Sequence, residues 1–380
     1  MSAPASPEKP ARVASVDALR GFSVFWLLGG EGAALALGDV SKQGGPFIQS
    51  AGNFLATQFT HAEWEGFRFW DLIFPLLIFV TGIAIVFSLP KVVEREGIAA
   101  AYVRIFRRAA LLIALGIIYY GGLSKLWPDI RLMGVLQRIG LAYLFAALLF
   151  LHLDWRGLIG ACVAILVGYW ALMTFVPVPG IGAGHYEANL NLANWIDANY
   201  LPGKQFDGNR DPEGLLSTLP AVATCLIGAL AGLLLQSGLT PQRKALIMIA
   251  GGAVMTLAGY LWGLQFPVIK SLWTSSFVLV SGGYSLMLLG LFYVLMDMWK
   301  RQMWATVFIW IGANALALYF INGIAGFEPF AKRLVGGNIA GFLADTIGTG
   351  AGRFVTHILA LTIATALAAY LYRRRVFIRV

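Results

Sequence analysis

Long apolar runs separated by polar loops are the feature that most restricts how this chain can fold. Between residues 72 and 89 the only polar side chains are Thr81 and Ser88, and similar runs recur along the sequence. A helix needs roughly 20 consecutive apolar residues to cross the hydrocarbon core of a bilayer. The sequence therefore predicts an all-α polytopic membrane protein.

The composition supports this class and excludes others. Hydrophobic residues make up 58% of the chain and charged residues 12%, whereas soluble domains have roughly one half and one quarter. The net charge of +9 comes from basic clusters between apolar runs, a pattern typical of membrane orientation signals rather than of nucleic-acid binding. We therefore expect no nucleic-acid partner. Cys162 and Cys225 lie inside apolar runs without metal-ligand spacing, so we expect no metal either.

Ten spans are predicted within a single domain of residues 1–380. They run near 18–38, 68–89, 106–123, 133–152, 157–176, 215–235, 245–264, 274–298, 305–323 and 351–371. One set of loops carries most of the Lys and Arg residues and is predicted to be cytoplasmic. An even number of spans places both termini on that side, including a flexible N-terminal segment of residues 1–14.

The opposite, non-cytoplasmic side receives the long loops, which we expect to form a lid or line a cavity. These loops cover residues 39–67, 124–132, 177–214, 265–273 and 324–350. Within the last loop, residues 335–348 are too few and too rich in glycine to span, and are predicted to form an interfacial or re-entrant helix. Small residues in the seventh span would permit packing as a homodimer.

A histidine and three acids lie at the mouth of the second span. His61, Glu63, Glu65 and Asp71 fall within eleven residues, together with Trp64. Histidine can take a proton from an attacking nucleophile or accept an acyl group, and the three acids can orient its ring. The alternative is a surface histidine that caps a helix or binds a lipid headgroup.

Ionisable residues inside spans are costly and usually face a bundle interior or an aqueous pocket. Glu31 in the first span is a candidate functional acid, or else one partner of a structural ion pair with a buried arginine. Arg138, beside Gln137 in the fourth span, can neutralise Glu31 or Asp71, hold an anionic ligand, or extend to the interface. Arg20 can anchor the inner end of the first span.

The loop before the sixth span ends in FDGNRDPEG, which contains Asp211 and Glu213. Carboxylates with nearby aromatic residues are typical of sugar-binding sites, but these two acids can also cap the helix that follows. Lys270, in the next outer loop, can pair with those acids or with a substrate. We find no phosphate-binding loop, GxSxG or HExxH motif, which disfavours P-loop nucleotide hydrolysis and zinc proteolysis.

Several blocks follow one another in order: SVDALRGF, THAEWEGFRFWDLIFPLLIFVTG, RIFRRAALLIALG, MGVLQRIGLAY, DPEGLLSTLPAVATCLIG and KSLWTSSF. Together they resemble the heparan-α-glucosaminide N-acetyltransferase family and its bacterial members. The resemblance implies transfer of an acetyl group from cytoplasmic acetyl-CoA to the amine of a terminal glucosamine across the membrane. It implies that His61 is catalytic, and it puts Glu31 where the animal enzymes have a catalytic asparagine.

The same resemblance implies a groove that carries the thioester towards His61. By position its phosphate-binding residues would be Arg20, Arg104, Arg107 and Arg108, with Arg138 and Gln137 deeper along it. Glu63, Trp64, Asp211, Glu213 and Lys270 are the predicted acceptor-binding residues.

The working hypothesis is an acetyl-CoA-dependent N-acetyltransferase of a bacterial inner membrane, acting on an amino sugar or envelope glycan. His61 would act as general base, with Glu31 or Asp71 holding its ring, or as a transient acyl acceptor. One alternative is an O-acyltransferase. Another is a proton-coupled transporter that uses Glu31, Asp71 and Arg138, although we find no inverted repeats.

Overall fold

The computed structural model describes residues 13–378. Within this range the chain forms helices and only isolated β-bridges, so the prediction of an all-α protein is confirmed. The N-terminal segment predicted to be flexible, residues 1–14, lies almost entirely outside the described residues.

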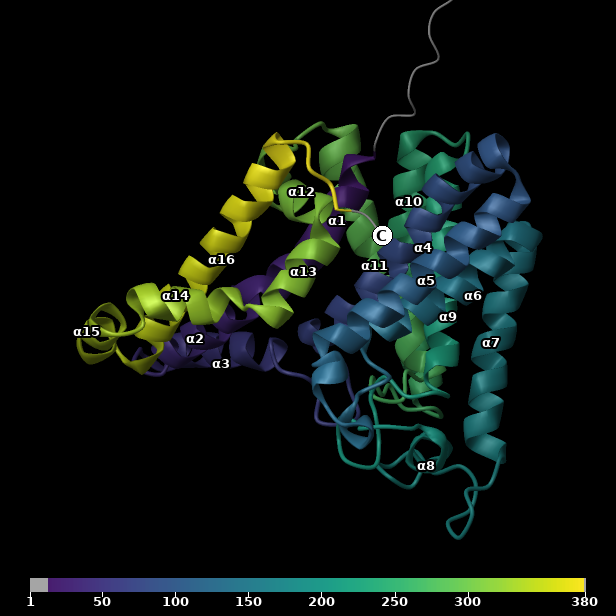
Figure 1. The fold of residues 1–380 in the computed structure, drawn as a ribbon, viewed down its shortest axis with the longest axis horizontal. Helices are drawn as coiled ribbons and strands as arrows, with labels where there is room; N and C mark the ends of the chain where they lie inside the picture. The colour runs from purple at the N-terminus through teal and green to yellow at the C-terminus, as the bar shows by residue number, and fades with distance from the viewer. Residues whose placement is uncertain (1–12, 379–380) are drawn as a thin grey trace, which may run out of the picture.

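The helices form two arms that diverge from a common junction (Figure 1). The terminal arm contains α1 (Ala14–Phe25), α2 (Glu31–Ser41), α3 (Pro46–Gln58), α12 (Thr306–Ala313), α13 (Ala315–Ile324), α14 (Phe327–Val335), α15 (Asn338–Thr346) and α16 (Thr349–Arg373). The central arm contains α4 (Phe69–Glu96), α5 (Ile98–Tyr119), α6 (Val135–His152), α7 (Trp155–Phe175), α8 (Leu192–Tyr200), α9 (Thr218–Gln236), α10 (Pro241–Gly263) and α11 (Ser275–Phe292). The arms join where α1 packs against α4 and α11.

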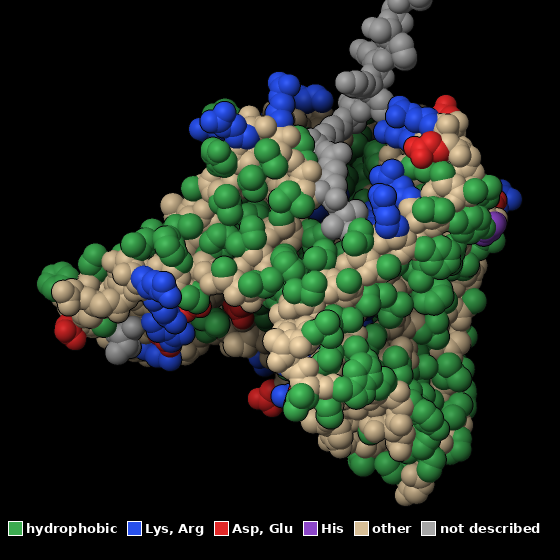
Figure 2. Space-filling model, viewed as in Figure 1, with side chains coloured by type: hydrophobic (Ala, Val, Ile, Leu, Met, Phe, Trp, Pro, Cys, Tyr) green, Lys and Arg blue, Asp and Glu red, His purple; other side chains and the backbone are tan. Residues whose placement is uncertain are grey.

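The interior of the central arm is built around α4 and α9. In the apolar stretch of each helix, 72% of the residues of α4 and 78% of those of α9 are buried. The corresponding share is 28% for α7, α10 and α16, so these three helices face the lipid. The two interior helices can approach closely because Gly228 has no side chain. Any side chain at this position would overlap the backbone of Phe79. Apolar side chains also cover much of the outer surface of the central arm (Figure 2).

The described residues contain fewer candidate spans than the ten predicted. Eight helical segments are long and apolar enough to cross a bilayer, or nine if α12 and α13, bent by 68°, count as one span. The third predicted span falls on α5, which has 22 residues but carries Arg104, Arg107 and Arg108. The chain is a polytopic membrane protein, and its described residues contain eight or nine candidate spans by length and composition, fewer than the ten predicted.

The first predicted span is interrupted rather than continuous. A π-helical turn, Trp26–Gly30, separates α1 from α2. Gly29 has a φ of 141° there, a conformation that is easily reached only by glycine. The break places Glu31 at the first residue of α2.

The outer loops form packed layers. Loop 177–214, which contains α8, and loop 265–273 pack against the end of α7 through a shared apolar cluster that includes Tyr169, Leu192 and Phe266. In the terminal arm, α15 lies within the predicted helical segment 335–348, packs on α16 and contacts α14 (Figure 1). That helix is confirmed, and its position in the membrane remains a prediction.

Both described ends of the chain lie at one end of the molecule. The carboxylate of Asp297 accepts hydrogen bonds from the backbone amides of Ala14 and Ser15 at 3.3 and 3.2 Å. The side-chain amide of Asn314 donates to the carbonyl of Val376 at 3.0 Å, and Val13 and Ile378 line the same cavity. This arrangement agrees with an even number of crossings, and which side of the membrane the termini occupy remains a prediction.

Candidate active site

Asp71 fixes the ring of His61 at the start of α4. One carboxylate oxygen of Asp71, Oδ2, caps the helix by accepting from the amides of Ala62 and Arg68 at 3.2 and 3.1 Å. The other, Oδ1, lies 2.7 Å from Nδ1 of His61. Because Asp71 is buried and its carboxylate only accepts, Nδ1 carries the proton and Nε2 is left as the basic nitrogen.

Lys270 completes this cluster from a distant loop. Its Nζ lies 3.0 and 3.2 Å from the two ring nitrogens of His61 and 3.5 Å from the Asp71 carboxylate. Burial lowers the pKa of Lys270, while the charges of Asp71, Glu213 and Glu31 oppose that shift. The expected pairing of Lys270 with the loop acids is corrected, since its direct contacts are His61 and Asp71.

Of the three acids expected to orient His61, only Asp71 contacts it. Glu63 and Glu65 are exposed and form no hydrogen bond or ion pair with His61 within residues 13–378. Trp64 is anchored instead by its indole N–H, which donates to the carbonyl of Tyr186 at 3.0 Å. Half of the His61 side chain, 53%, is exposed, so the site is open to an acceptor from this end.

A buried ion cluster lies next to this site. Arg131 binds the carboxylates of Asp211 at 2.8 Å and Glu213 at 2.6 Å, and its guanidinium stacks 4.5 Å from the Tyr120 ring. Burial alone would lower the pKa of Arg131. Its hydrogen bond to Asp211 and the charge of Glu213 outweigh that effect, so the pKa of Arg131 is raised. Asp211 and Glu213 are thus already neutralised by a residue that sequence reasoning did not select.

Arg138 and Gln137 are fully enclosed in α6. Arg138 donates to the Ser217 hydroxyl and lies 4.9 Å from the Trp273 ring, with no exposed surface. It therefore does not extend to the interface, and it contacts neither Glu31 nor Asp71 among the described residues. Two nitrogens of Arg138 and both amide atoms of Gln137 lack hydrogen-bond partners there, which leaves unmet capacity for a ligand or water.

Glu31 lies across the junction in the terminal arm. It lines a cavity of about 340 Å³ together with Asn322, Glu328 and His357. No hydrogen bond or ion pair joins Glu31 to His61 within residues 13–378, although its charge acts on Lys270. Of the two acids expected to hold the His61 ring, Asp71 is the one in contact.

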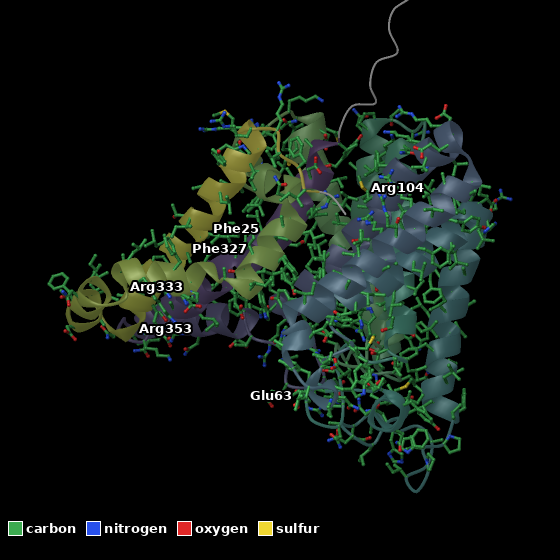
Figure 3. All side chains as sticks on the ribbon, viewed as in Figure 1. Phe25, Glu63, Arg104, Phe327, Arg333 and Arg353 are labelled. Carbon is green, nitrogen blue, oxygen red and sulfur yellow. The ribbon has the colours of Figure 1, made fainter. Side chains whose placement is uncertain are left out.

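A cationic groove opens at the opposite end of the molecule, where the arms meet. Its cavity of about 430 Å³ is lined by Arg20, Lys91, Arg104 and Arg108, from α1, α4 and α5, and by one acid, Asp17, which accepts a hydrogen bond from Arg20 at 3.3 Å. Figure 2 shows Lys and Arg side chains gathered at this end, and Figure 3 shows Arg104 and Glu63 towards opposite ends of the central arm. Arg107 is exposed and does not line this cavity, whereas Lys91 does.

The groove continues into the membrane-spanning part. A second cavity of about 120 Å³ shares Arg20 and Arg108 with the first and extends to Thr81 and Tyr319. Ser88 lines the first cavity and Thr81 the second. The two polar side chains of the apolar run 72–89 therefore both face this path.

Comparison with known proteins gives two similar sequences. The chain is 26% identical over 333 residues to human heparan-alpha-glucosaminide N-acetyltransferase, covering 71% of this chain and 46% of the human protein. The mouse enzyme of the same name is 26% identical over 285 residues, covering 58% of this chain and 42% of its own length. The chain is a distant relative of the heparan-alpha-glucosaminide N-acetyltransferases. No family model matches it.

This relationship agrees with the resemblance drawn from the motifs, but the chain spans only about half the length of these N-acetyltransferases. In the part of the chain that the structure describes, no group of three or more His, Cys, Asp or Glu residues is arranged to hold a metal ion.

Proposed function

We propose that this protein transfers an acetyl group from acetyl-CoA, bound in the cationic groove, to the amine of an amino sugar at His61. The observation that supports this most is the arrangement along α4. Asp71, which holds His61, and Lys91, which lines the groove, are 20 residues apart. At 1.5 Å per residue this separation is roughly 30 Å, the thickness of a bilayer core.

The groove fits the phosphate end of the donor. Guanidinium groups bind phosphate oxygens through directed, charge-assisted hydrogen bonds, and Arg20, Arg104 and Arg108 can supply them. The buried Nε of Arg108 has no hydrogen-bond partner among the described residues, so it is available to a ligand. Because acetyl-CoA is cytoplasmic, this end and both termini would face the cytoplasm.

The chemistry follows from the state of His61. Its Nε2 takes a proton from the acceptor amine as the nitrogen attacks the thioester carbonyl carbon. A C–N bond forms, the C–S bond breaks, and the imidazolium returns the proton to the departing thiolate. Asp71 stabilises the imidazolium, and Lys270 is close enough to donate to the oxyanion that develops on the carbonyl oxygen. In a covalent variant, Nε2 attacks the thioester carbonyl carbon, the C–S bond breaks and CoA leaves as the thiolate. The acceptor amine then attacks the acetyl-histidine, the bond from the acetyl carbon to Nε2 breaks, and the amine proton passes to the released imidazole.

The relatives' names support an amino sugar as the acceptor class. We propose a glucosamine-type amine, free or within an envelope glycan, on the non-cytoplasmic side of a bacterial inner membrane. Glu63 and Trp64, close in sequence to His61, are the proposed acceptor contacts, and Glu31 would contribute from its separate cavity in the terminal arm.

Purified protein with labelled acetyl-CoA and a panel of amino sugars and neutral sugars tests this function. Label should appear on amino sugars and be lost in His61→Ala that still folds. Label on neutral sugars alone would indicate an O-acyltransferase, and full transfer by His61→Ala would contradict the site. Sugar uptake into vesicles without acetyl-CoA consumption would indicate a transporter. Labelling of the protein without acceptor, absent in His61→Ala, would support the covalent route.

A further inference from the structure

The cationic groove ends at an aromatic contact between the two arms. The first cavity reaches Ala84 on α4 and Leu316 on α13, and the second reaches Leu77 and Tyr319, further towards the His61 end of both helices. There the ring of Tyr319 stacks face to face on that of Tyr119 from α5, with centroids 5.0 Å apart and planes 3° apart.

The far side of this pair belongs to the acceptor end. Tyr119 contacts the edge of Tyr120 at 5.1 Å, and Tyr120 lies under Arg131, which holds Glu213. Tyr119 also packs on the backbone of Gly323, where a side chain would overlap its ring. Gly323 lines the cavity that contains Glu31. The stacked pair therefore lies between the donor groove on one side and, on the other, the Arg131 cluster and the Glu31 cavity.

Two properties of this contact suit a gate. The rings come from different arms, so they can part by rotation of side chains or by a small movement of α13 against α5 without breaking either helix. Closed, the rings present flat apolar surfaces to the groove and a packed barrier to water. An aperture of this kind discriminates by size, because a single extra methylene in a close-fitting apolar site changes specificity roughly tenfold or more.

We propose that Tyr119 and Tyr319 form a gate that admits the acetyl thioester to His61, excludes longer acyl chains and shields the thioester from water. The inference rests on the proposed acetyl transfer and adds a determinant of donor specificity. Neither tyrosine is a catalytic residue in this account, since both act by controlling passage.

The test compares acetyl-, propionyl- and butyryl-CoA as donors to one amino sugar, with Tyr319→Ala, Tyr119→Ala and Tyr319→Phe. Each alanine variant should raise the ratio of propionyl to acetyl kcat/KM about tenfold. It should also increase release of CoA thiol without acceptor, since water then adds to the carbonyl carbon and the C–S bond breaks. Tyr319→Phe keeps the stack and should retain wild-type selectivity. Tyr370→Ala, exposed on α16, is the matched control.

Wild-type protein that transfers no acetyl group would contradict the proposed function, whatever the variants do. Active wild type together with alanine variants of unchanged selectivity and unchanged acceptor-free hydrolysis would overturn the gate. Equal loss of transfer for all three donors in folded variants would also overturn it, because that indicates a structural role. If one alanine variant does not fold, the other decides, and Gly323→Ala, which must displace the Tyr119 ring, replaces both if neither folds.

Discussion

His61 is half exposed, yet its imidazole is held in one orientation because its partner is buried. Asp71 is held in turn by two backbone amides at the start of α4, so the carboxylate cannot turn away from the ring. One carboxylate oxygen of Asp71 caps α4, and the other orients the ring of His61. This sharing explains how a loop histidine can be fixed without being enclosed.

Asp71→Asn should separate these two tasks. The amide oxygen can still cap α4, but an uncharged group no longer stabilises an imidazolium, so we expect kcat for acetyl transfer to fall roughly 100-fold. Steady-state kinetics on protein with an unchanged thermal midpoint would measure this. Glu65→Gln, a nearby exposed acid, is the control and should change kcat less than about threefold. Equal activity of Asp71→Asn and wild type would show that Asp71 does not support His61.

Arg131 should be important for stability, because its removal leaves Asp211 and Glu213 buried and unpaired. We expect Arg131→Met to lower the free energy of unfolding by about 3–5 kcal/mol. Arg210→Met, which breaks the exposed pair between Arg210 and Asp207, should cost about 1 kcal/mol or less. Chemical unfolding in detergent measures both. Similar values for the two variants would contradict the assignment of Arg131 as the centre of a buried cluster.

Local sequence identified some of these residues and missed others for a physical reason. His61 and Asp71 are ten positions apart beside a span, so their proximity follows from the chain itself. Lys270 is 209 positions from His61, and Arg131 is 80 from Asp211. Those contacts depend on which loops pack together, and hydropathy and motif spacing carry no information about that. The buried environment of Arg138 was equally hidden, because its position in the fourth span allowed both interior and interface.

At the scale of elements, the spans were predictable and their interruptions were not. Apolar length locates α4, α6, α7, α9, α10, α11 and α16 closely, but it treats residues 18–38 as one straight helix. The π-helical turn depends on the backbone of Gly29, and residue type alone does not fix φ. For α5, the predicted span 106–123 begins eight residues and ends four residues later than the helix Ile98–Tyr119.

The break before Glu31 gives a prediction at this scale. Gly29→Ala should destabilise the protein by about 1 kcal/mol or more, because an L side chain is strained at φ 141° and the break cannot form freely. Gly168→Ala, in α7 with open space around it, should be neutral or stabilising by up to about 1 kcal/mol. Thermal midpoints of the two variants provide the comparison. Gly29→Ala as stable as Gly168→Ala would show that the break is not imposed by this glycine.

At the scale of the whole molecule, Arg104, Arg107 and Arg108 are compatible with two roles, setting the topology and binding phosphate. Positive charge near the inner ends of spans predicts topology, and it also predicts a phosphate site, so the sequence could not distinguish the two roles. In the structure, these arginines differ in position around α5. Arg104 and Arg108 line the groove between the arms, whereas Arg107 faces away from it.

This division can be tested with neighbouring residues. Arg104→Gln should raise KM for acetyl-CoA about tenfold with little change in kcat, because a charge-assisted contact to phosphate is lost and the chemistry at His61 is not touched. Arg107→Gln removes the same charge from the same helix and should leave KM nearly unchanged. Steady-state kinetics in low and moderate salt give both values. Equal effects of the two variants would indicate a diffuse electrostatic contribution instead of a groove.

The central claim is that donor and acceptor meet from opposite sides of the membrane, and sidedness measures it most directly. Proteoliposomes are prepared with the termini facing outwards, as judged by protease access to an N-terminal tag, and an amino sugar is sealed inside. Labelled acetyl-CoA added outside should give acetylated sugar inside, and His61→Ala should give none. The account would be contradicted if product formed only when acetyl-CoA and the amino sugar were on the same side.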